Sequence, residues 1–388
     1  MWLSQFLSSA GFCFVFPFIP FYIAELGVKD PMMRNMWVGL FSAAGYFSLF
    51  LSSPIWGFLS DIYGRRVMIL RTTFVSGLLI PLMAFVPGVG WLVFIRFLIG
   101  MFSGTVTASQ ILVSSNTPLA RRGFAMGSLS SAVHGGHMAG MFLGGIVVDQ
   151  LGYQTAFFIC SLTLMAAGLL VLFGVKEEFH KTSSLRAMSK TFKFRLPDFG
   201  GVWFILLLIM LMGFAVRFDA PYLPLLVETV NGPDKAATWT GVIASLSAVA
   251  GIISGSLLGW VADRVPAPKV AVWSALLAGL LMIPQGLACS LPLLISSRLG
   301  MVFFAGGLDP VLQIWLAKST PDAKRGMFLG WATSAKSLGW FFCSLTGGGV
   351  AMLMGVRSVY LVAAVLFLLL IPIIRVTIRQ LHKGQATA

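Results

Sequence analysis

Twelve long apolar stretches dominate this chain of 388 residues. Hydrophobic residues make up 57% of it and charged residues only 10%, which excludes an ordinary soluble domain. A bilayer core about 30 Å thick requires about 20 apolar residues per helix, and these stretches far exceed the roughly ten-residue segments of a β-barrel. The sequence therefore predicts an all-α integral membrane protein with twelve transmembrane helices, near residues 2–23, 36–58, 68–86, 91–112, 124–147, 154–174, 200–227, 238–260, 269–287, 292–316, 326–350 and 356–376.

An internal repeat divides the chain. Gly57-Phe-Leu-Ser-Asp61 returns 202 positions later as Gly259-Trp-Val-Ala-Asp263, and the same offset carries Arg96 onto Arg298. A constant register through several apolar stretches indicates two homologous halves, which in membrane proteins usually enclose one central substrate site. We expect two pseudo-symmetric six-helix bundles, at 1–174 and 200–388, joined by a cytoplasmic linker at 175–199; the second bundle ends in a short cytoplasmic tail.

The formal net charge of +14 follows membrane topology. Most Lys and Arg residues lie in alternate connections, among them 65–71, 121–122 and the polar linker, and the opposite connections hold few. This bias is typical of the cytoplasmic side of a membrane, so both termini and the linker are predicted to be cytoplasmic. The basic charge is thereby explained without nucleic acid, and we expect no nucleic-acid partner.

Several chemistries lack their sequence signatures. No GxxxxGK[ST] loop is present, which argues against ATP-driven transport. The cysteines at 13, 160, 289 and 343 show no pairing or metal-ligand spacing, so no disulfide, metal or cofactor is expected. No charged segment or small-residue cleavage site surrounds the first apolar stretch, and no signal peptide is expected.

A short motif carries a family resemblance. Gly57-Phe-Leu-Ser-Asp61-Ile-Tyr-Gly64-Arg65-Arg66, expected as a loop between the second and third helices, resembles the G-x-x-x-D-[RK]-x-G-[RK]-[RK] signature of the major facilitator superfamily. Ile62 replaces a basic residue of that pattern. The second copy keeps Asp263 and Arg264 but has Pro266 where the first has Gly64. In the family this segment gates the cytoplasmic side; an alternative is that its basic residues only set topology.

Two further motifs follow in the family's order. Arg96-Phe-Leu-Ile-Gly100-Met-Phe-Ser-Gly104, in the fourth helix, is similar to R-x-x-x-G-x-x-x-G, whose Arg takes part in proton handling in proton-coupled relatives. The fifth helix keeps every glycine of the antiporter signature G-x-x-x-G-P-x-x-G-G but has Met141 instead of proline. Close helix packing is expected to survive there without the proline kink. The four glycines of that helix-packing motif are Gly136, Gly140, Gly144 and Gly145.

The order of the motifs most resembles twelve-helix drug:proton antiporters, in particular the multidrug-resistance branch. The resemblance implies a transporter, not an enzyme, in the plasma membrane (the bacterial inner membrane). Because one chain already contains both halves, we expect a monomer. The resemblance also implies export of a lipophilic or amphiphilic small molecule in exchange for protons by alternating access. It further implies that helices one, four, seven and ten line the cavity.

Ionisable side chains at membrane depth are candidate functional residues, because each costs several kcal/mol unless paired or hydrated. Asp219, in the seventh helix beside a proline-rich break, is the first candidate for a proton site; a structural ion pair is the alternative. Arg217 lies two residues away, so the two side chains are predicted to point apart. Arg96 is a second coupling candidate, and its repeat mate Arg298 is expected to be structural.

The tenth and eleventh helices carry a possible charge pair. Asp309 precedes Pro310 at a helix break. Lys336 requires a partner, for which Asp309 or Asp219 is expected. Such a pair is either a coupling switch that breaks on protonation or a fixed structural pair. The remaining candidates are His134 with His137, as a proton relay or as packing residues, and Gln110 with Gln313, as substrate hydrogen-bonding groups.

Other functions remain open. A sugar or metabolite exporter or uniporter is an alternative with the same fold. Met141 supports this alternative, because it replaces the proline of the antiporter signature. An intramembrane enzyme requires a Ser–His or paired-Asp constellation, and no protease or lipid-transferase motif surrounds Asp219 or Asp309. A transporter-like sensor, which binds ligand without flux, is a third possibility.

Overall fold

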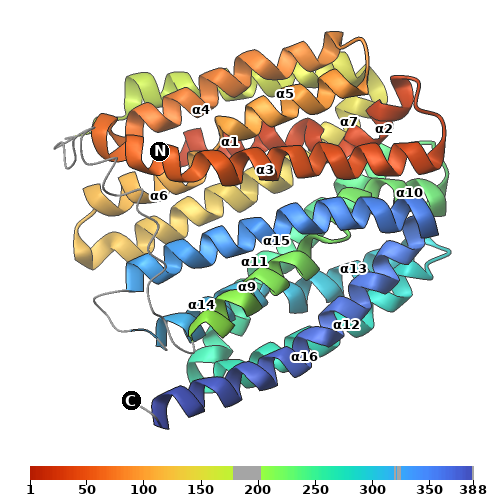
Figure 1. Ribbon diagram of the computed structural model, residues 1–388. Coiled ribbons are helices and arrows are strands. Elements are labelled where there is room, and N and C mark those ends of the chain that lie inside the picture. The colour runs from red at the N-terminus through yellow and green to blue at the C-terminus, as the bar shows by residue number, and fades with distance from the viewer. Residues whose placement is uncertain (178–201, 319, 321–324, 387–388) are drawn as a thin grey trace. The chain divides into compact units, whose positions relative to one another are not determined.

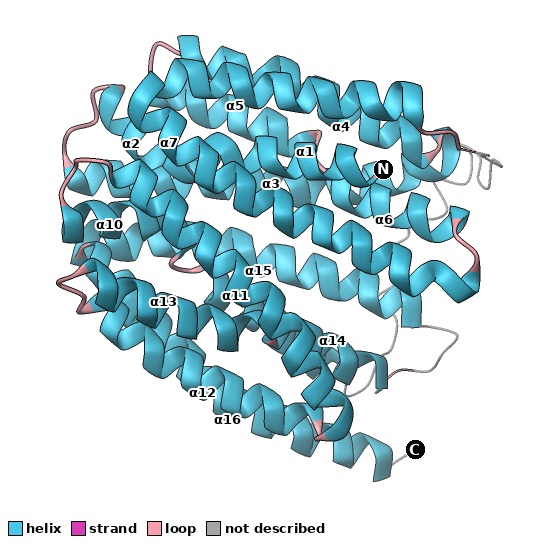
Figure 2. Ribbon diagram, turned by 180° about the vertical axis from the view of Figure 1, so that it is seen from behind, coloured by secondary structure: helices cyan, strands magenta, loops and turns pink. Residues whose placement is uncertain are grey.

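The computed structural model describes residues 1–177, 202–318, 320 and 325–386. Within these residues every regular element is helical, and no strand is present (Figure 2). In the part of the chain that the structure describes, eleven helical segments are long and apolar enough to cross a membrane; one of them, Ala125–Gly174, has 50 residues. At about 1.5 Å per residue this segment is roughly twice as long as a bilayer core requires. It reverses at Gly152 (φ 78°, ψ 174°) and so provides two crossings. The described residues therefore provide twelve crossings, the number predicted from the sequence.

The first half of the chain provides six crossings. The first combines α1, η1 and α2, the second is α3, the third combines α4 and η2, the fourth combines α5 and α6, and α7 provides the fifth and sixth. Their bounds are α1 Trp2–Val15, η1 Phe16–Phe18, α2 Ile19–Glu25, α3 Pro31–Tyr63, α4 Arg65–Leu79, η2 Ile80–Phe85, α5 Val89–Met101, α6 Thr105–Asn116 and α7 Leu119–Gly174.

The second half follows the same plan. The seventh crossing combines α9, η3 and α10, the tenth combines α13 and α14, and single helices provide the others. The bounds are α9 Val202–Arg217, η3 Ala220–Tyr222, α10 Leu223–Asn231, α11 Ala236–Arg264, α12 Ala267–Gly286, α13 Leu291–Gly306, α14 Leu308–Lys318, α15 Arg325–Met354 and α16 Val356–Ala386.

The described residues cluster into two compact units. The first takes them from Met1–Tyr22, Phe47–Leu196 and Ala237–Ser245; α1 packs on α7, and α4 and α5 lie side by side (Figure 1). The second takes them from Ile23–Tyr46, Pro197–Ala236 and Leu246–Ala388; α12 packs on α13 and α16, and α9 packs on α15. Buried residues such as Phe18, Phe157, Tyr222 and Phe367 fill these helix contacts.

Crossings one, four, seven and ten are each interrupted. Pro17 and Pro221 lie in the 3-10 segments η1 and η3, where their missing N–H groups favour a break. The fourth crossing breaks before Gly104, whose φ of 127° is unfavourable for any residue with a side chain. Gly306, its repeat mate, ends α13. A break frees main-chain groups, and in transporters such breaks often border the substrate site.

The signature segment differs from the expected loop. Gly57–Tyr63 continues α3 for nearly two turns, and Gly64 (φ 91°) alone separates it from α4. In the second copy, α11 likewise extends to Arg264. In both copies the signature segment therefore continues the preceding helix, which ends at Tyr63 in the first copy and at Arg264 in the second.

Candidate functional site

The two motif arginines each reach the break in the first helix of their own half. Arg96 projects from α5 and places its guanidinium carbon 4.4 Å from the ring centre of Phe16 in η1. Arg298 projects from α13 and forms an ion pair with Asp219, the residue immediately before η3. One arginine therefore contacts an aromatic ring, and its repeat mate contacts a carboxylate.

The Asp219–Arg298 pair is deeply buried. Asp219 is 0% exposed and Arg298 8% exposed. The side-chain oxygen of Gln285, on α12, lies 3.5 Å from the Arg298 guanidinium, whereas Asp219 Oδ1 has no hydrogen-bond partner. A buried acceptor without a partner is costly. Removing either charge of the pair would leave the other uncompensated in the interior.

Asp309 and Lys336 form a second ion pair in the same unit. Lys336 Nζ, on α15, lies 2.8 Å from Asp309 Oδ2 in the first turn of α14, and Gln313 donates to Asp309 Oδ1 at 3.1 Å. The side chains are 19% (Lys336) and 37% (Asp309) exposed, so water reaches this carboxylate but not that of Asp219.

Arg217 and Asp219 contact different helices. Asp219 faces α13, whereas the Arg217 guanidinium carbon lies 5.3 Å from the ring centre of Trp340 on α15. Lys336 Nζ lies 5.6 Å from the same ring. The two acidic residues thus belong to separate pairs, Asp219–Arg298 and Asp309–Lys336. Arg217 lies near the second pair, because it and Lys336 contact the same Trp340 ring.

The glycines of the antiporter-like motif make close main-chain contacts. A Cβ at Gly136, Gly140 or Gly144 would collide with main-chain atoms of α1, and one at Gly145 would collide with the Ala237 carbonyl of α11. Within α7 the only non-helical backbone is at Gly152, so Met141 produces no kink.

The remaining predicted residues are spread over several surfaces. Gln110 is exposed on α6. His134 is exposed on α7, with its ring centre 6.4 Å from that of His137. The side chains of Asp61 and Asp263 and the surroundings of Gly57 and Gly259 lie outside the described part of the structure. Residues 178–201, which include most of the linker predicted at 175–199, lie outside it as well. Arg264 lies over Trp260, with its guanidinium carbon 3.6 Å from the ring centre.

Two carboxylates not predicted from the sequence hold helix N-termini. Glu177 accepts the main-chain N–H groups of Arg65 (2.9 Å) and Arg66 (2.8 Å) at the start of α4. Asp149 accepts the main-chain N–H (2.7 Å) and hydroxyl (2.6 Å) of Thr238 at the start of α11. Both positions favour an anion because of the helix dipole. In the sequence, each of these acids is visible only as an acidic residue near the end of a predicted helix, and nothing there identifies the main-chain groups that it binds.

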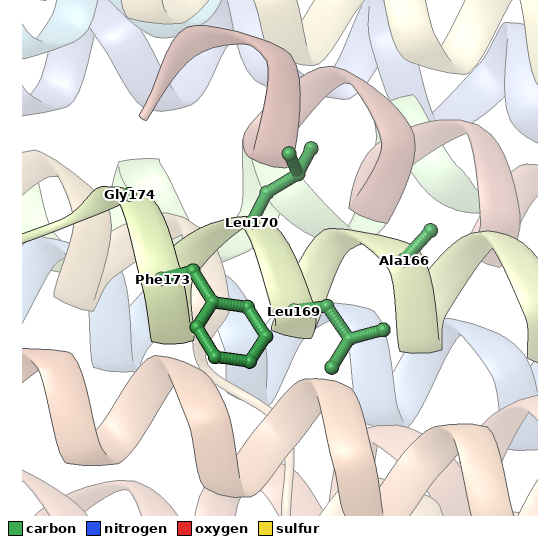
Figure 3. A pocket seen from close by; sticks show the side chains of 5 residues that line it. All are labelled: Ala166, Leu169, Leu170, Phe173 and Gly174. Carbon is green, nitrogen blue, oxygen red and sulfur yellow. The ribbon is translucent and has the colours of Figure 1, made fainter.

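A shallow apolar hollow lies on the last turns of α7. Ala166, Leu169, Leu170, Phe173 and Gly174 line it, and Figure 3 shows Leu169 and Phe173 on one side of the helix and Leu170 on another. Phe173 is 82% exposed. Because no polar side chain lines this hollow, it suits lipid chains and offers no groups that would orient a substrate.

Comparisons with known proteins agree on one family. A model described as "Major Facilitator Superfamily" matches residues 1–284 and 205–387. The multidrug resistance protein MdtG of Proteus mirabilis (strain HI4320) is 31% identical over 375 residues, covering 96% of this chain and 93% of that protein. The protein of the same name from Escherichia fergusonii is 29% identical over 372 residues, covering 94% and 90%.

Solved structures share the fold. A structure of the nucleoside transporter NupG (D323A mutant) has a TM-score of 0.78 at 11% identity, covering 97% of this chain and 98% of that one. The human organic anion transporter MFSD10 (TETRAN) has a TM-score of 0.68 at 19% identity, covering 96% and 97%.

Proposed function

Because the chain belongs to the major facilitator superfamily, a family of membrane transporters, we propose that it exports lipophilic or amphiphilic small molecules in exchange for protons by alternating access. The MdtG relatives support a multidrug type of substrate, since their name describes multidrug resistance. We further propose a monomer in the bacterial inner membrane, with both termini cytoplasmic and with halves at 1–174 and 200–388.

The observation that carries proton coupling is the ion pair between Lys336 and Asp309. Its carboxylate is 37% exposed, so protons have access to it from water. Protonation would remove the charge that holds Lys336, and the contact between α14 and α15 would weaken. A pair that breaks when a proton binds links protonation to helix movement, which proton exchange by alternating access requires.

Other candidates take supporting roles in this proposal. Asp219 is a second proton site, reached only when the buried pair with Arg298 opens; Arg96 and His134 complete the coupling set. Gln110 and Gln313 offer hydrogen bonds to substrate. The gating segments are Gly57, Asp61, Gly64, Arg65 and Arg66 with Gly259, Asp263 and Arg264.

Proteoliposomes with a trapped pH-sensitive dye test the proposal. A panel of lipophilic cations, organic anions, neutral drugs and sugars is added to the wild type, Asp309→Asn and Asp219→Asn. Asp234→Asn is the control, because Asp234 is exposed beyond α10. We expect substrate-triggered proton movement in the wild type and control, and its loss in Asp309→Asn.

Labelled substrate distinguishes the alternatives. Flux without proton movement in the wild type would contradict proton coupling and favour a uniporter. Unchanged proton movement in both Asp variants would keep antiport and remove these two residues from it.

A further inference from the structure

Two cationic side chains flank one indole ring in the second unit. Arg217 of α9 and Lys336 of α15 lie 5.3 Å and 5.6 Å from the ring centre of Trp340. The ring of Tyr46, on α3, lies 5.6 Å from the same indole. Cations are attracted to the face of an indole ring, so this cluster places positive charge beside a flat apolar surface.

The charges around Trp340 do not balance. Asp309 is the carboxylate of this cluster, and both of its oxygens already accept hydrogen bonds, from Lys336 and Gln313. The nearby Asp219 is neutralised by Arg298. Among the described residues no carboxylate lies within 4.0 Å of the exposed Arg217 guanidinium. Arg217, Lys336 and Asp309 together therefore carry a formal net charge of +1.

Arg217 also lies near the middle of its crossing, which runs from Trp203 to Asn231. A cation at this depth is costly against lipid, so it faces water or a ligand. A guanidinium matches the planar, two-oxygen geometry of a carboxylate or sulfonate. A cationic ligand, in contrast, would have to compete with Lys336 for Asp309.

We propose that Arg217, Lys336 and Trp340 select organic anions with an aromatic or apolar body. The anionic group binds Arg217 with support from Lys336, and the body of the ligand packs against Trp340 and Tyr46. This inference rests on the proposed export function and narrows its substrate class from amphiphiles in general to anionic ones.

Two permanently charged probes with the same ring test the inference: naphthalene-1-sulfonate and N,N,N-trimethyl-1-naphthylammonium. Equilibrium dialysis with the purified full chain measures binding, and proteoliposomes measure flux. We expect the sulfonate to bind about tenfold more tightly than the ammonium, the order expected for one charge-assisted hydrogen bond. Arg217→Gln should abolish this preference, and Arg217→Lys should retain most of it.

Arg357→Gln is the matched control, since it removes a positive charge at the start of α16, outside the cluster. It should keep the preference for the sulfonate. Tighter binding of the ammonium by the wild type, binding of neither probe, or an unchanged preference in Arg217→Gln would each overturn the inference. Proton-driven flux of the ammonium alone would leave the proposed export function standing, whereas sulfonate binding without proton-driven flux would contradict only the coupling.

Discussion

Met101 and Phe303 lie 202 positions apart, and the main-chain carbonyl of each accepts a side-chain hydrogen bond beside a helix break. Trp56 Nε1, on α3, donates to the Met101 carbonyl at 2.6 Å, and the Ser254 hydroxyl, on α11, donates to the Phe303 carbonyl. In each half, the donor belongs to the helix two crossings before the broken one, α3 in the first half and α11 in the second. At the break in the fourth crossing, Arg71 also donates to the Ser103 carbonyl at 3.3 Å, with its guanidinium carbon 3.4 Å from the centre of the Trp56 ring.

Trp56→Phe should lower the thermal stability of the protein in detergent. Phenylalanine keeps a ring beside Arg71 but leaves the Met101 carbonyl unpaired, at a cost of about 1–3 kcal/mol. Trp273→Phe is the control, because Trp273 is 63% exposed on α12. Melting temperatures followed by tryptophan-independent light scattering compare the two. Equal shifts would show that the indole N–H contributes nothing specific.

Removing one member of the buried Asp219–Arg298 pair should be strongly destabilising. Asp219→Leu or Arg298→Met leaves one uncompensated charge in the interior, at a cost of about 3–5 kcal/mol. The double variant removes both charges and should be more stable than either single variant. Thermal denaturation of all three proteins tests this. A double variant whose loss equals the sum of the single losses would mean that the two charges do not interact.

Gly140→Ala should disturb the packing of α1 on α7. Its Cβ would overlap the main chain at Ala10, where neither backbone yields easily, and overpacking of this kind costs about 1–3 kcal/mol. At Gly135 a Cβ would meet only the Phe6 ring, at 3.5 Å, which is an ordinary contact. Gly135→Ala should therefore unfold at the wild-type temperature. A larger loss in Gly135→Ala than in Gly140→Ala would contradict this packing account.

Exchanging the charges of Asp309 and Lys336 should recover part of the transport lost in each single variant. Lys336→Asp and Asp309→Lys each place like charges together, whereas the double exchange restores an ion pair. Because both side chains are partly exposed, we expect a coupling energy of about 1 kcal/mol or less. Initial transport rates in proteoliposomes provide the comparison. No recovery in the double variant would indicate that each residue acts in its own position and not through the pair.

The sequence predicted the helical membrane fold and the family, because apolar stretches and three ordered motifs are local features. It also limited the partner of Lys336 to two acids, one of which is found there. It did not reveal that Asp219 pairs with Arg298, since these residues lie 79 positions apart and the first half has Phe16, not an acid, opposite Arg96. Trp56, Glu177 and Asp149 escaped notice because each acts on a main-chain group, and sequence patterns do not identify such partners.

The reversal at Gly152 bears on how the chain acquires its orientation during synthesis. Residues 145–160, around the turn, contain no Lys or Arg, so no positive charge there can hold that end on one side of the membrane. The fifth and sixth crossings are joined without a loop, and one cannot be inverted without the other. The positive charges of Arg121 and Arg122, in the first turn of α7, and of Lys176, just beyond its last residue, are therefore expected to set the direction in which this hairpin inserts.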